Sequence, residues 1–172
     1  MSRTLMWRST VGGMAMSQEQ TRAQFLWQAI RLAVDNVEQG RAPFGALVVL
    51  DDQVVGTGVN TEAQDDDPTA HAEVGAIRDA CRRLGTLDLT GAVVVSSCEP
   101  CALCQVACAL VQVGTIIYAA PREFVPGNGK ARPDLVRMQG TLRAMAGDSI
   151  QYVPTPGADE PFKRYLETGG RS

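Results

Sequence analysis

The single histidine of the chain, His71, lies two residues before Glu73, and two cysteines, Cys101 and Cys104, follow further along. One imidazole and two thiolates can hold a zinc ion tetrahedrally with the fourth position open to water, which distinguishes a catalytic zinc site from a closed structural one. Zinc lowers the pKa of bound water from ~15.7 toward ~7, and a carboxylate beside that water can carry its proton. These residues predict one zinc ion (Zn2+) per chain, held by His71, Cys101 and Cys104, with Glu73 as the catalytic proton carrier.

Two other interpretations of the cysteines stay open at this point. Cys98 can serve as a fourth ligand, which would make the zinc site structural and closed. The four cysteines within residues 98–108 also follow the spacing of a ferredoxin iron–sulfur run, except that Ala109 replaces the proline of that run. An iron–sulfur cluster would leave His71 and Glu73 without a role, and it would require two cysteines one helical turn apart to leave helical geometry.

Composition bounds the partners of the protein. A net charge of −3 and scattered arginines argue against a nucleic-acid partner, because phosphate contacts need a clustered basic surface. No apolar run reaches the ~20 residues of a membrane helix, and residues 1–16 lack the continuous apolar stretch of a signal peptide. We therefore expect no membrane partner and a cytoplasmic location, where cysteines stay reduced. We expect a single domain over 17–172, preceded by a disordered extension over 1–16.

The spacing of apolar residues predicts alternating helices and strands. Ser17–Gln20 resembles a capping box that opens a helix, and Gly40 ends this helix. The segments 44–50 and 53–59 are rich in β-formers and resemble an antiparallel hairpin. The remaining segments are, in order, a loop over 60–69, a helix over 70–84, a strand over 92–96, a helix over 100–111 with Pro100 as its first residue, a strand over 115–119, a loop over 121–133, a helix over 135–146, an edge strand over 150–153 and a helix over 159–167. This order predicts an α/β fold, a three-layer α/β/α sandwich around a mixed five-stranded sheet.

From Pro43 to Ala120 the chain resembles the cytidine deaminase-like superfamily, whose zinc-dependent nucleobase deaminases carry H-x-E followed by P-C-x-x-C. The matching segments are Pro43–Ala46, Gly58–Asn60, Asp67–Glu73, Ser97–Cys104 and Tyr118–Ala120. Within the superfamily the chain is most similar to the bacterial guanine deaminase type, and Asp67–Glu73 also resembles the tRNA adenosine deaminases. The resemblance implies a zinc cofactor and a hydrolytic deaminase that releases ammonia.

The resemblance also implies roles for substrate-binding residues. Phe44 would line the base pocket, Asn60 would hydrogen-bond the polar edge of the ring, and the backbone of Ala72 would contact a ring carbonyl. Asp134 aligns with an acid that contacts the substrate. The structural alternatives for the first three are a core aromatic, a turn-forming asparagine and ordinary helix backbone.

The C-terminal tail, residues 155–172, is similar to the guanine deaminase tail, in which an aromatic residue closes the active site as a lid, sometimes from a swapped partner subunit. Tyr165 would be that residue, and a homodimer would follow from a swapped tail; packing within the last helix is the alternative. Leu110 stands where the guanine deaminase type has tryptophan. Guanine, related amino-purines, amino-s-triazines such as ammeline, and cytosine-like rings therefore all remain candidate substrates.

We expect a hydrolase that deaminates a free nucleobase or a base-like heterocycle, so that its partner is a small molecule. Two alternatives belong to other classes of protein. One is a tRNA adenosine deaminase, which a continuous basic surface beside the metal would favour. The other is a non-catalytic zinc-binding module, which a substitution of Glu73 would have indicated.

Overall fold

The computed structural model describes residues 10–11, 14–15, 17–127 and 133–170. Its centre is a five-stranded sheet in the order β4–β3–β5–β6–β7. The strands are β3 (Gly45–Leu50), β4 (Gln53–Val59), β5 (Val93–Cys98), β6 (Thr115–Ala120) and β7 (Ile150–Tyr152). β3 is antiparallel to both β4 and β5, whereas β5, β6 and β7 run parallel to one another. The predicted mixed sheet is confirmed, with β7 at one edge.

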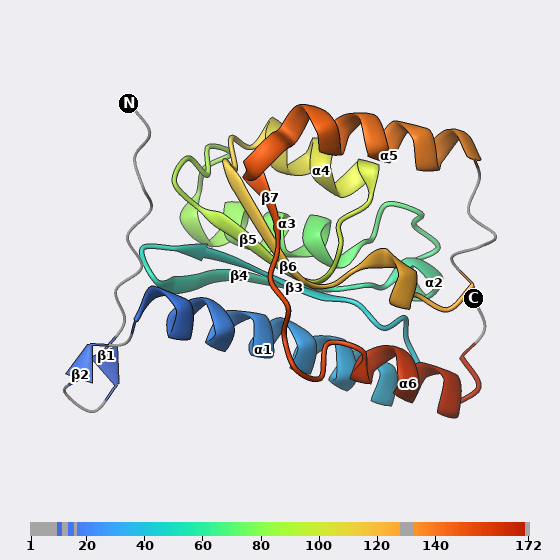
Figure 1. Ribbon diagram of the computed structural model, residues 1–172. Helices are drawn as coiled ribbons and strands as arrows, with labels where there is room; N and C mark the ends of the chain where they lie inside the picture. The colour runs from blue at the N-terminus through green and yellow to red at the C-terminus, as the bar shows by residue number, and fades with distance from the viewer. Residues whose placement is uncertain (1–9, 12–13, 16, 128–132, 171–172) are drawn as a thin grey trace.

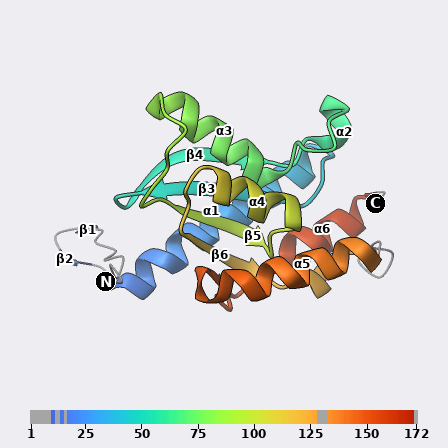
Figure 2. The same cartoon turned by 90° about the horizontal axis from the view of Figure 1, so that it is seen from above.

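Helices cover both faces of this sheet. They are, in chain order, α1 (Gln18–Glu38), α2 (Glu62–Asp65), α3 (Ala72–Leu84), α4 (Ala102–Leu110), η1 (Arg122–Phe124), α5 (Pro133–Ala146), η3 (Gly147–Ser149) and α6 (Glu160–Glu167). α1 and α6 lie on one face, and α3, α4 and α5 lie on the other (Figures 1 and 2). The predicted three-layer α/β/α sandwich is therefore confirmed.

The start of α1 forms the predicted capping box. The Oγ atom of Ser17 accepts a hydrogen bond from the backbone N–H of Gln20, and the Gln20 side chain accepts one from the N–H of Ser17. The expected loop after Asn60 differs from the structure, because it contains the one-turn helix α2. No apolar periodicity marks so short a helix, which explains why the sequence did not indicate it.

The start of α4 differs from the expectation that Pro100 is its first residue. Cys101 is the N-cap and Ala102 the first helical residue, so Pro100 lies before the cap. The carbonyl of Pro100 accepts a hydrogen bond of 3.0 Å from the Gln105 side chain, and the carbonyl of Cys101 accepts the backbone N–H of Gln105. Cys101 therefore has an extended backbone conformation at the N-terminus of the helix.

Two apolar cores hold the layers together, one on each face of the sheet. β5 is buried along its whole length, and Val93, Val94 and Val95 point alternately into the two cores. Phe44, the residue before β3, packs against both cores. It therefore lies at the end of the sheet where the two helical layers meet.

α3 packs unusually close to β4, because the strand has glycines where the helix crosses it. A Cβ atom at Gly58 would overlap the backbone of Ala72 and Ala76, and a Cβ atom at Gly56 would overlap the backbone of Ala76 and Ala80. Only glycine leaves room for such an approach of two backbones. Gly58 therefore sets how deeply the first turn of α3 lies on the sheet.

Most of the predicted disordered extension, residues 1–16, lies outside the described residues. Its described parts, β1 (Thr10–Val11) and β2 (Met14–Ala15), pair with each other as a short antiparallel ladder. Within the described residues, every helix is too short or too polar to cross a membrane.

Candidate active site

The three predicted metal ligands come from the starts of two neighbouring helices. His71 is the N-cap of α3, Cys101 is the N-cap of α4, and Cys104 lies in the first turn of α4. The Nδ1 atom of His71 is 3.4 Å from the Sγ atom of each cysteine, and the two Sγ atoms are 3.6 Å apart. Among the described residues this is the one group of three or more histidine, cysteine and acidic side chains that could hold a metal ion.

The spacing of these three atoms fits a zinc ion. With ordinary Zn–S and Zn–N bond lengths, the edges of a tetrahedral site are about 3.8 Å between two sulfurs and about 3.5 Å between sulfur and nitrogen. The distances in the structure, 3.6 Å and 3.4 Å, lie close to both edges. His71, Cys101 and Cys104 therefore provide three ligands for one zinc ion and leave its fourth position to a non-protein group.

The electrostatics of the site favour a bound cation. Hydrogen bonding with Cys104, and to a lesser extent with His71, lowers the pKa of the Cys101 thiol to about 3. The hydrogen bond with Cys101 raises the pKa of His71 to about 9, whereas sharing a proton with Cys101 raises the pKa of the Cys104 thiol. Without a metal ion, the site thus holds protons on the atoms that would bind the ion, and metal binding releases such protons.

Glu73 lies in the first turn of α3, next to the ligands but outside their group. It is only 7% exposed. Its Oε1 accepts a hydrogen bond of 3.0 Å from the Ser96 hydroxyl, and its Oε2 lies 3.2 Å from the Cys104 Sγ. Burial raises the pKa of the Glu73 carboxyl above its ordinary value. A carboxylate with a raised pKa, fixed beside a metal site, is suited to accept and return protons.

The two other interpretations of the cysteines, Cys98 as a fourth zinc ligand and an iron–sulfur cluster, disagree with this geometry. Cys98 packs in the core on the α1 face, and Cys108 packs in the core on the α3 face. Burial raises the pKa of Cys98 to about 12 and also raises the pKa of Cys108. Neither residue joins the metal-ligand group, so a fourth cysteine ligand and a four-cysteine iron–sulfur cluster are both excluded by position.

An aromatic pair lies at the end of the sheet near Phe44. The ring of Phe44 makes an edge-to-face contact with the ring of Phe162 in α6, and the two ring centroids are 6.0 Å apart. Phe162 is buried in the core on the α1 face. The tail therefore reaches Phe44 through Phe162, which the sequence analysis did not single out. The signal in the sequence is an apolar residue directly before the charged Lys163-Arg164 pair, and the sequence alone does not distinguish this residue from Tyr165.

Asn60 and Ala72, two predicted substrate-binding residues, come from the elements that flank His71. Asn60 is buried directly after β4, and its carbonyl accepts a hydrogen bond of 2.9 Å from the Asn36 side chain. Ala72 is the first residue of α3, where a backbone N–H has no acceptor within the helix. That N–H lies directly after the metal ligand His71, and the Asn60 side chain comes from the end of β4.

The other two predicted substrate contacts lie in the last two α-helices, α5 and α6. Asp134 is an exposed residue in the first turn of α5. Tyr165 is half-buried in α6, and its ring packs closely against the backbone of Gly170. No described contact joins either residue to the metal ligands, so their roles remain predictions.

Three further residues support the site without a motif of their own. Ser96 bonds Glu73, Glu62 lies 3.5 Å from His71 Nε2, and Phe162 contacts Phe44. Each contact joins residues that are distant in sequence or lie in a loop without regular periodicity. Their identification therefore required the structure.

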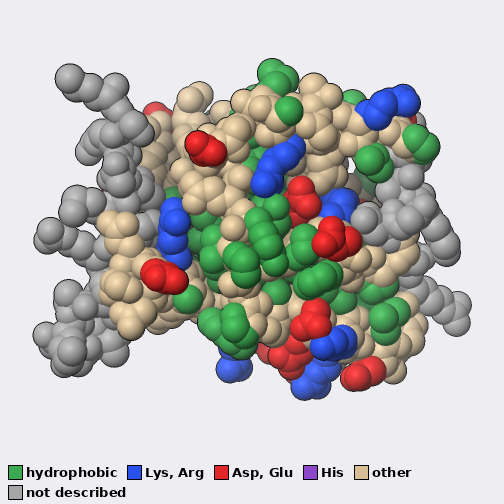
Figure 3. All heavy atoms as spheres, viewed as in Figure 1, with side chains coloured by type: hydrophobic (Ala, Val, Ile, Leu, Met, Phe, Trp, Pro, Cys, Tyr) green, Lys and Arg blue, Asp and Glu red, His purple; other side chains and the backbone are tan. Residues whose placement is uncertain are grey.

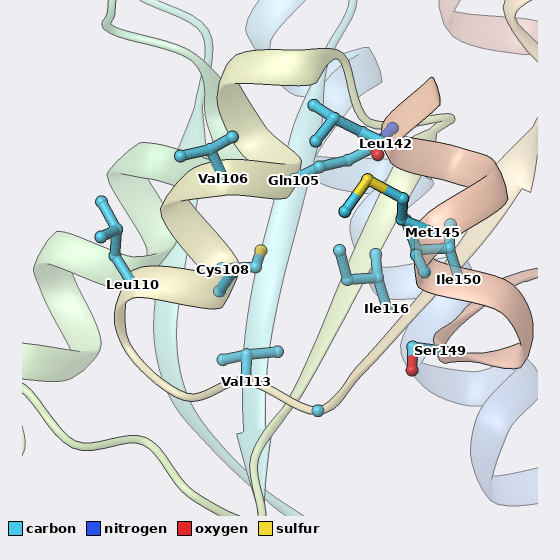
Figure 4. Close-up of a pocket in the computed structure, with 13 residues that line it drawn as sticks. Gln105, Val106, Cys108, Leu110, Val113, Ile116, Leu142, Met145, Ser149 and Ile150 are labelled. Atoms are coloured by element: carbon cyan, nitrogen blue, oxygen red, sulfur yellow. The ribbon is translucent and has the colours of Figure 1, made fainter. Parts of the chain in front are cut away.

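A separate cavity of about 470 Å³ lies between α4 and α5 (Figure 4). Val106, Cys108, Ile116, Leu142 and Met145 are among its mostly apolar lining residues. None of the metal ligands lines it. It connects to the site indirectly, because Gln105, which points into it, also donates a hydrogen bond to the carbonyl of Pro100.

A three-ligand zinc centre with a buried carboxylate, set at the helix starts of an α/β/α sandwich, defines a class of metal-binding catalytic domains. Residues 19–120 match the family model described as the cytidine and deoxycytidylate deaminase zinc-binding region. The chain belongs to this family. The match includes all three ligands and Glu73 and stops before α5 and α6. It therefore covers the metal site but not the C-terminal tail.

Individual relatives differ in what they act on. The guanine deaminase of Bacillus subtilis is 42% identical over 97 residues, which cover 56% of this chain and 62% of the relative. The tRNA-specific adenosine deaminase of Aquifex aeolicus is 38% identical over 96 residues, 56% of this chain and 64% of the relative. The chain thus spans less than two thirds of these curated relatives.

A solved structure extends the comparison to the rest of the chain. The X-ray structure of the Bacillus subtilis guanine deaminase matches with a TM-score of 0.57 and 28% identity. The match covers 91% of this chain and 98% of that one. The similarity to a guanine deaminase therefore includes regions beyond the zinc-binding segment.

Proposed function

We propose that this protein is a zinc-dependent hydrolytic deaminase of a free nucleobase or base-like heterocycle, such as guanine, ammeline or a cytosine-like ring. The observation that carries the proposal is the position of Glu73. Its buried carboxylate lies 3.2 Å from a ligand sulfur and is held by Ser96. A purely structural zinc module has no use for such a group.

The chemistry requires a nucleophile and a proton carrier. When bound, the zinc ion supplies an acidified water at neutral pH. Glu73 removes a proton from the attacking water and delivers it to a ring nitrogen while oxygen bonds to the carbon that carries the amine. Glu73 then takes the remaining proton from the added hydroxyl group and passes it to that amine, which leaves as ammonia, so that the ring keeps a carbonyl group. Atoms balance with water as the only co-reactant.

Two features favour a free base as the substrate. The Phe44–Phe162 pair places apolar surface at the end of the sheet that holds the metal site, and apolar walls suit a planar ring better than ribose and phosphate. On the face shown in Figure 3, lysines and arginines are interspersed with acidic side chains rather than gathered in a stripe. The extended similarity to guanine deaminase supports the same choice.

A tRNA adenosine deaminase is the second candidate, because the Aquifex aeolicus relative with that activity is 38% identical. It would need a basic surface beside the metal site to bind the phosphates of RNA. The two candidates predict opposite substrate preferences and can therefore be separated in one assay.

Ammonia release should be measured for guanine, cytosine, adenine, ammeline, the corresponding nucleosides and tRNA. We expect turnover of at least one free base, with kcat/KM at least tenfold above that of its nucleoside, since the aromatic pair limits the space beside the ring. Turnover of tRNA without activity on any free base would instead establish the second candidate.

We also propose that the protein is a cytoplasmic homodimer, formed through the exposed surfaces of α4 and α5 around the cavity between these two helices. Several large apolar side chains on these helices are exposed: Leu103, Val106 and Leu110 on α4, and Leu135, Val136, Met138 and Met145 on α5. α5 has no buried residue. Exposed apolar surface of this extent is typical of protein interfaces. A second copy is the simplest partner, and α6 packs on α1 of its own chain, so this dimer needs no swapped tail.

Replacing Leu110 and Met145 with glutamate should convert the dimer to a monomer, because both side chains are more than three-quarters exposed in the single chain and would carry charge into the interface. Sedimentation velocity measures the change. Leu87→Glu is the control, since Leu87 is equally exposed but lies after α3. A wild-type monomer at micromolar concentration would contradict the proposal.

A further inference from the structure

One carboxylate contacts two residues of the site at once. Glu62 is the first residue of α2. Its Oε1 lies 3.5 Å from the Nε2 atom of His71, and its Oε2 accepts a hydrogen bond of 2.5 Å from the Nδ2 group of Asn60. Nε2 is the ring nitrogen that faces away from the two cysteines, whose contacts are with Nδ1. Glu62 therefore joins the metal ligand to the predicted substrate-binding amide.

The backbone holds Glu62 in this place. The N–H of Glu62 donates to the Asn60 Oδ1 at 3.3 Å, and the carbonyl of Glu62 accepts the N–H of Asp67. The N–H of Thr61 donates to the carbonyl of Ala70 at 3.0 Å, which closes the loop between Asn60 and His71. The Glu62 side chain is 41% exposed, but these hydrogen bonds hold the backbone that carries it in place.

The His71 contact has a defined chemical consequence. A neutral imidazole carries its proton on one nitrogen and a lone pair on the other, and the partner of one nitrogen decides which form is present. A carboxylate beside Nε2 favours the proton there, so that the lone pair stays on Nδ1. Such second partners of metal-binding histidines also make the ring a better ligand.

The Asn60 contact fixes the orientation of an amide whose two ends have opposite hydrogen-bonding character. Because Nδ2 donates to the carboxylate and Oδ1 accepts from the Glu62 N–H, the amide cannot flip without losing both bonds. Nδ2 keeps one free hydrogen and Oδ1 keeps one free lone pair. Asn60 can thus offer a fixed donor and acceptor to the polar edge of a heterocycle.

We propose that Glu62 is a positioning residue that keeps the Nδ1 atom of His71 available to the zinc ion and holds the amide of Asn60 in one orientation. The first half of this role depends only on the zinc site. The second half rests on the proposed function, because it concerns how a base is recognised. Glu62 itself touches neither the ion nor the substrate.

Zinc affinity tests the first half. Competition with a chromogenic chelator should show that Glu62→Ala binds zinc about 10–100-fold more weakly than the wild type, the range typical of lost partners of metal-binding histidines. Glu62→Gln should lie between the two, since its amide oxygen still accepts a hydrogen bond. Asp65→Asn is the matched control: it changes a carboxylate on the same helical turn that bonds Thr61 instead of His71. Affinity of Glu62→Ala within twofold of the wild type would overturn the role.

The single histidine makes the second measurement unusually direct. In protein labelled with ¹⁵N-histidine, the zinc-loaded wild type should give one imidazole signal with its proton on Nε2 and slow exchange of that proton. Glu62→Ala should exchange it at least tenfold faster, whereas Asp65→Asn should not. Identical exchange in all three proteins would show that Glu62 does not hold the Nε2 proton.

Steady-state kinetics on the best free base tests the second half. At saturating zinc, Glu62→Ala should raise KM at least fivefold, because the side-chain acceptor that holds the Nδ2 group of Asn60 is then lost. An unchanged KM together with weakened zinc binding would overturn the Asn60 role alone. If the wild type deaminates no base, the proposed function fails, and the zinc and NMR measurements still decide the His71 role.

Discussion

Glu73→Gln is expected to lower the rate of deamination by more than the ~10²–10⁴-fold typical of one acid–base group, because a single carboxylate serves several proton transfers. Glutamine has nearly the same shape as glutamate, and its side-chain oxygen can still accept the hydrogen bond from Ser96. The variant should therefore fold and retain one zinc ion per chain. Single-turnover ammonia release and metal analysis together measure both properties.

The comparison variant for Glu73 is Glu99→Gln. Glu99 precedes the Pro100–Cys101 pair, and its carboxylate accepts the backbone N–H of Arg122 at 3.4 Å instead of facing the ligand group. This variant should stay within tenfold of the wild type. If Glu73→Gln also stayed within tenfold, the assignment of the proton carrier would be wrong.

Cys101→Ala is expected to remove zinc from the protein. Only His71 and Cys104 would remain as ligands, and two protein ligands do not make the three-ligand set of a catalytic zinc site. Metal analysis after dialysis against a weak chelator should show one zinc ion per chain in the wild type and background zinc in the variant. Deamination should be lost in parallel.

The remaining cysteines of the same segment provide matched controls. Cys98→Ala and Cys108→Ala remove a thiol from one core each, and we expect both variants to keep zinc with only a modest loss of stability. Full zinc retention by Cys101→Ala would contradict the ligand assignment. Iron and labile sulfide in the wild type would contradict the metal itself.

The regular elements and the metal ligands could be predicted from the sequence because their signals are local. The hairpin strand Gln53–Val59 has the predicted bounds, and the capping box at Ser17 forms as expected. Likewise, the H-x-E and P-C-x-x-C motifs each lie at the start of one helix, and such short patterns can be recognised without knowledge of the fold.

The supporting contacts could not be predicted because they join residues that only the fold brings together. Ser96 reaches Glu73 from a different element, with nothing in the spacing of the two residues to suggest it. The sequence does not distinguish Phe162 from Tyr165, because it does not show which aromatic ring of the tail turns inward. Side-chain direction in a short terminal helix depends on the surface beneath it, here α1 and Phe44.

The close approach of α3 to β4 has a consequence for how this protein can diversify. Because any side chain at Gly58 would collide with the backbone of α3, the strand and the helix start behave as one rigid piece, and His71 and Glu73 travel with it. Successive substitutions therefore cannot move His71 and Glu73 gradually to suit a substrate with a different ring. α5, which has no buried residue, and α6, which packs on α1 rather than on β4, are free of that restriction. Changes of substrate among descendants of this chain should accumulate in those two helices, while His71 and Glu73 stay where the glycine holds them.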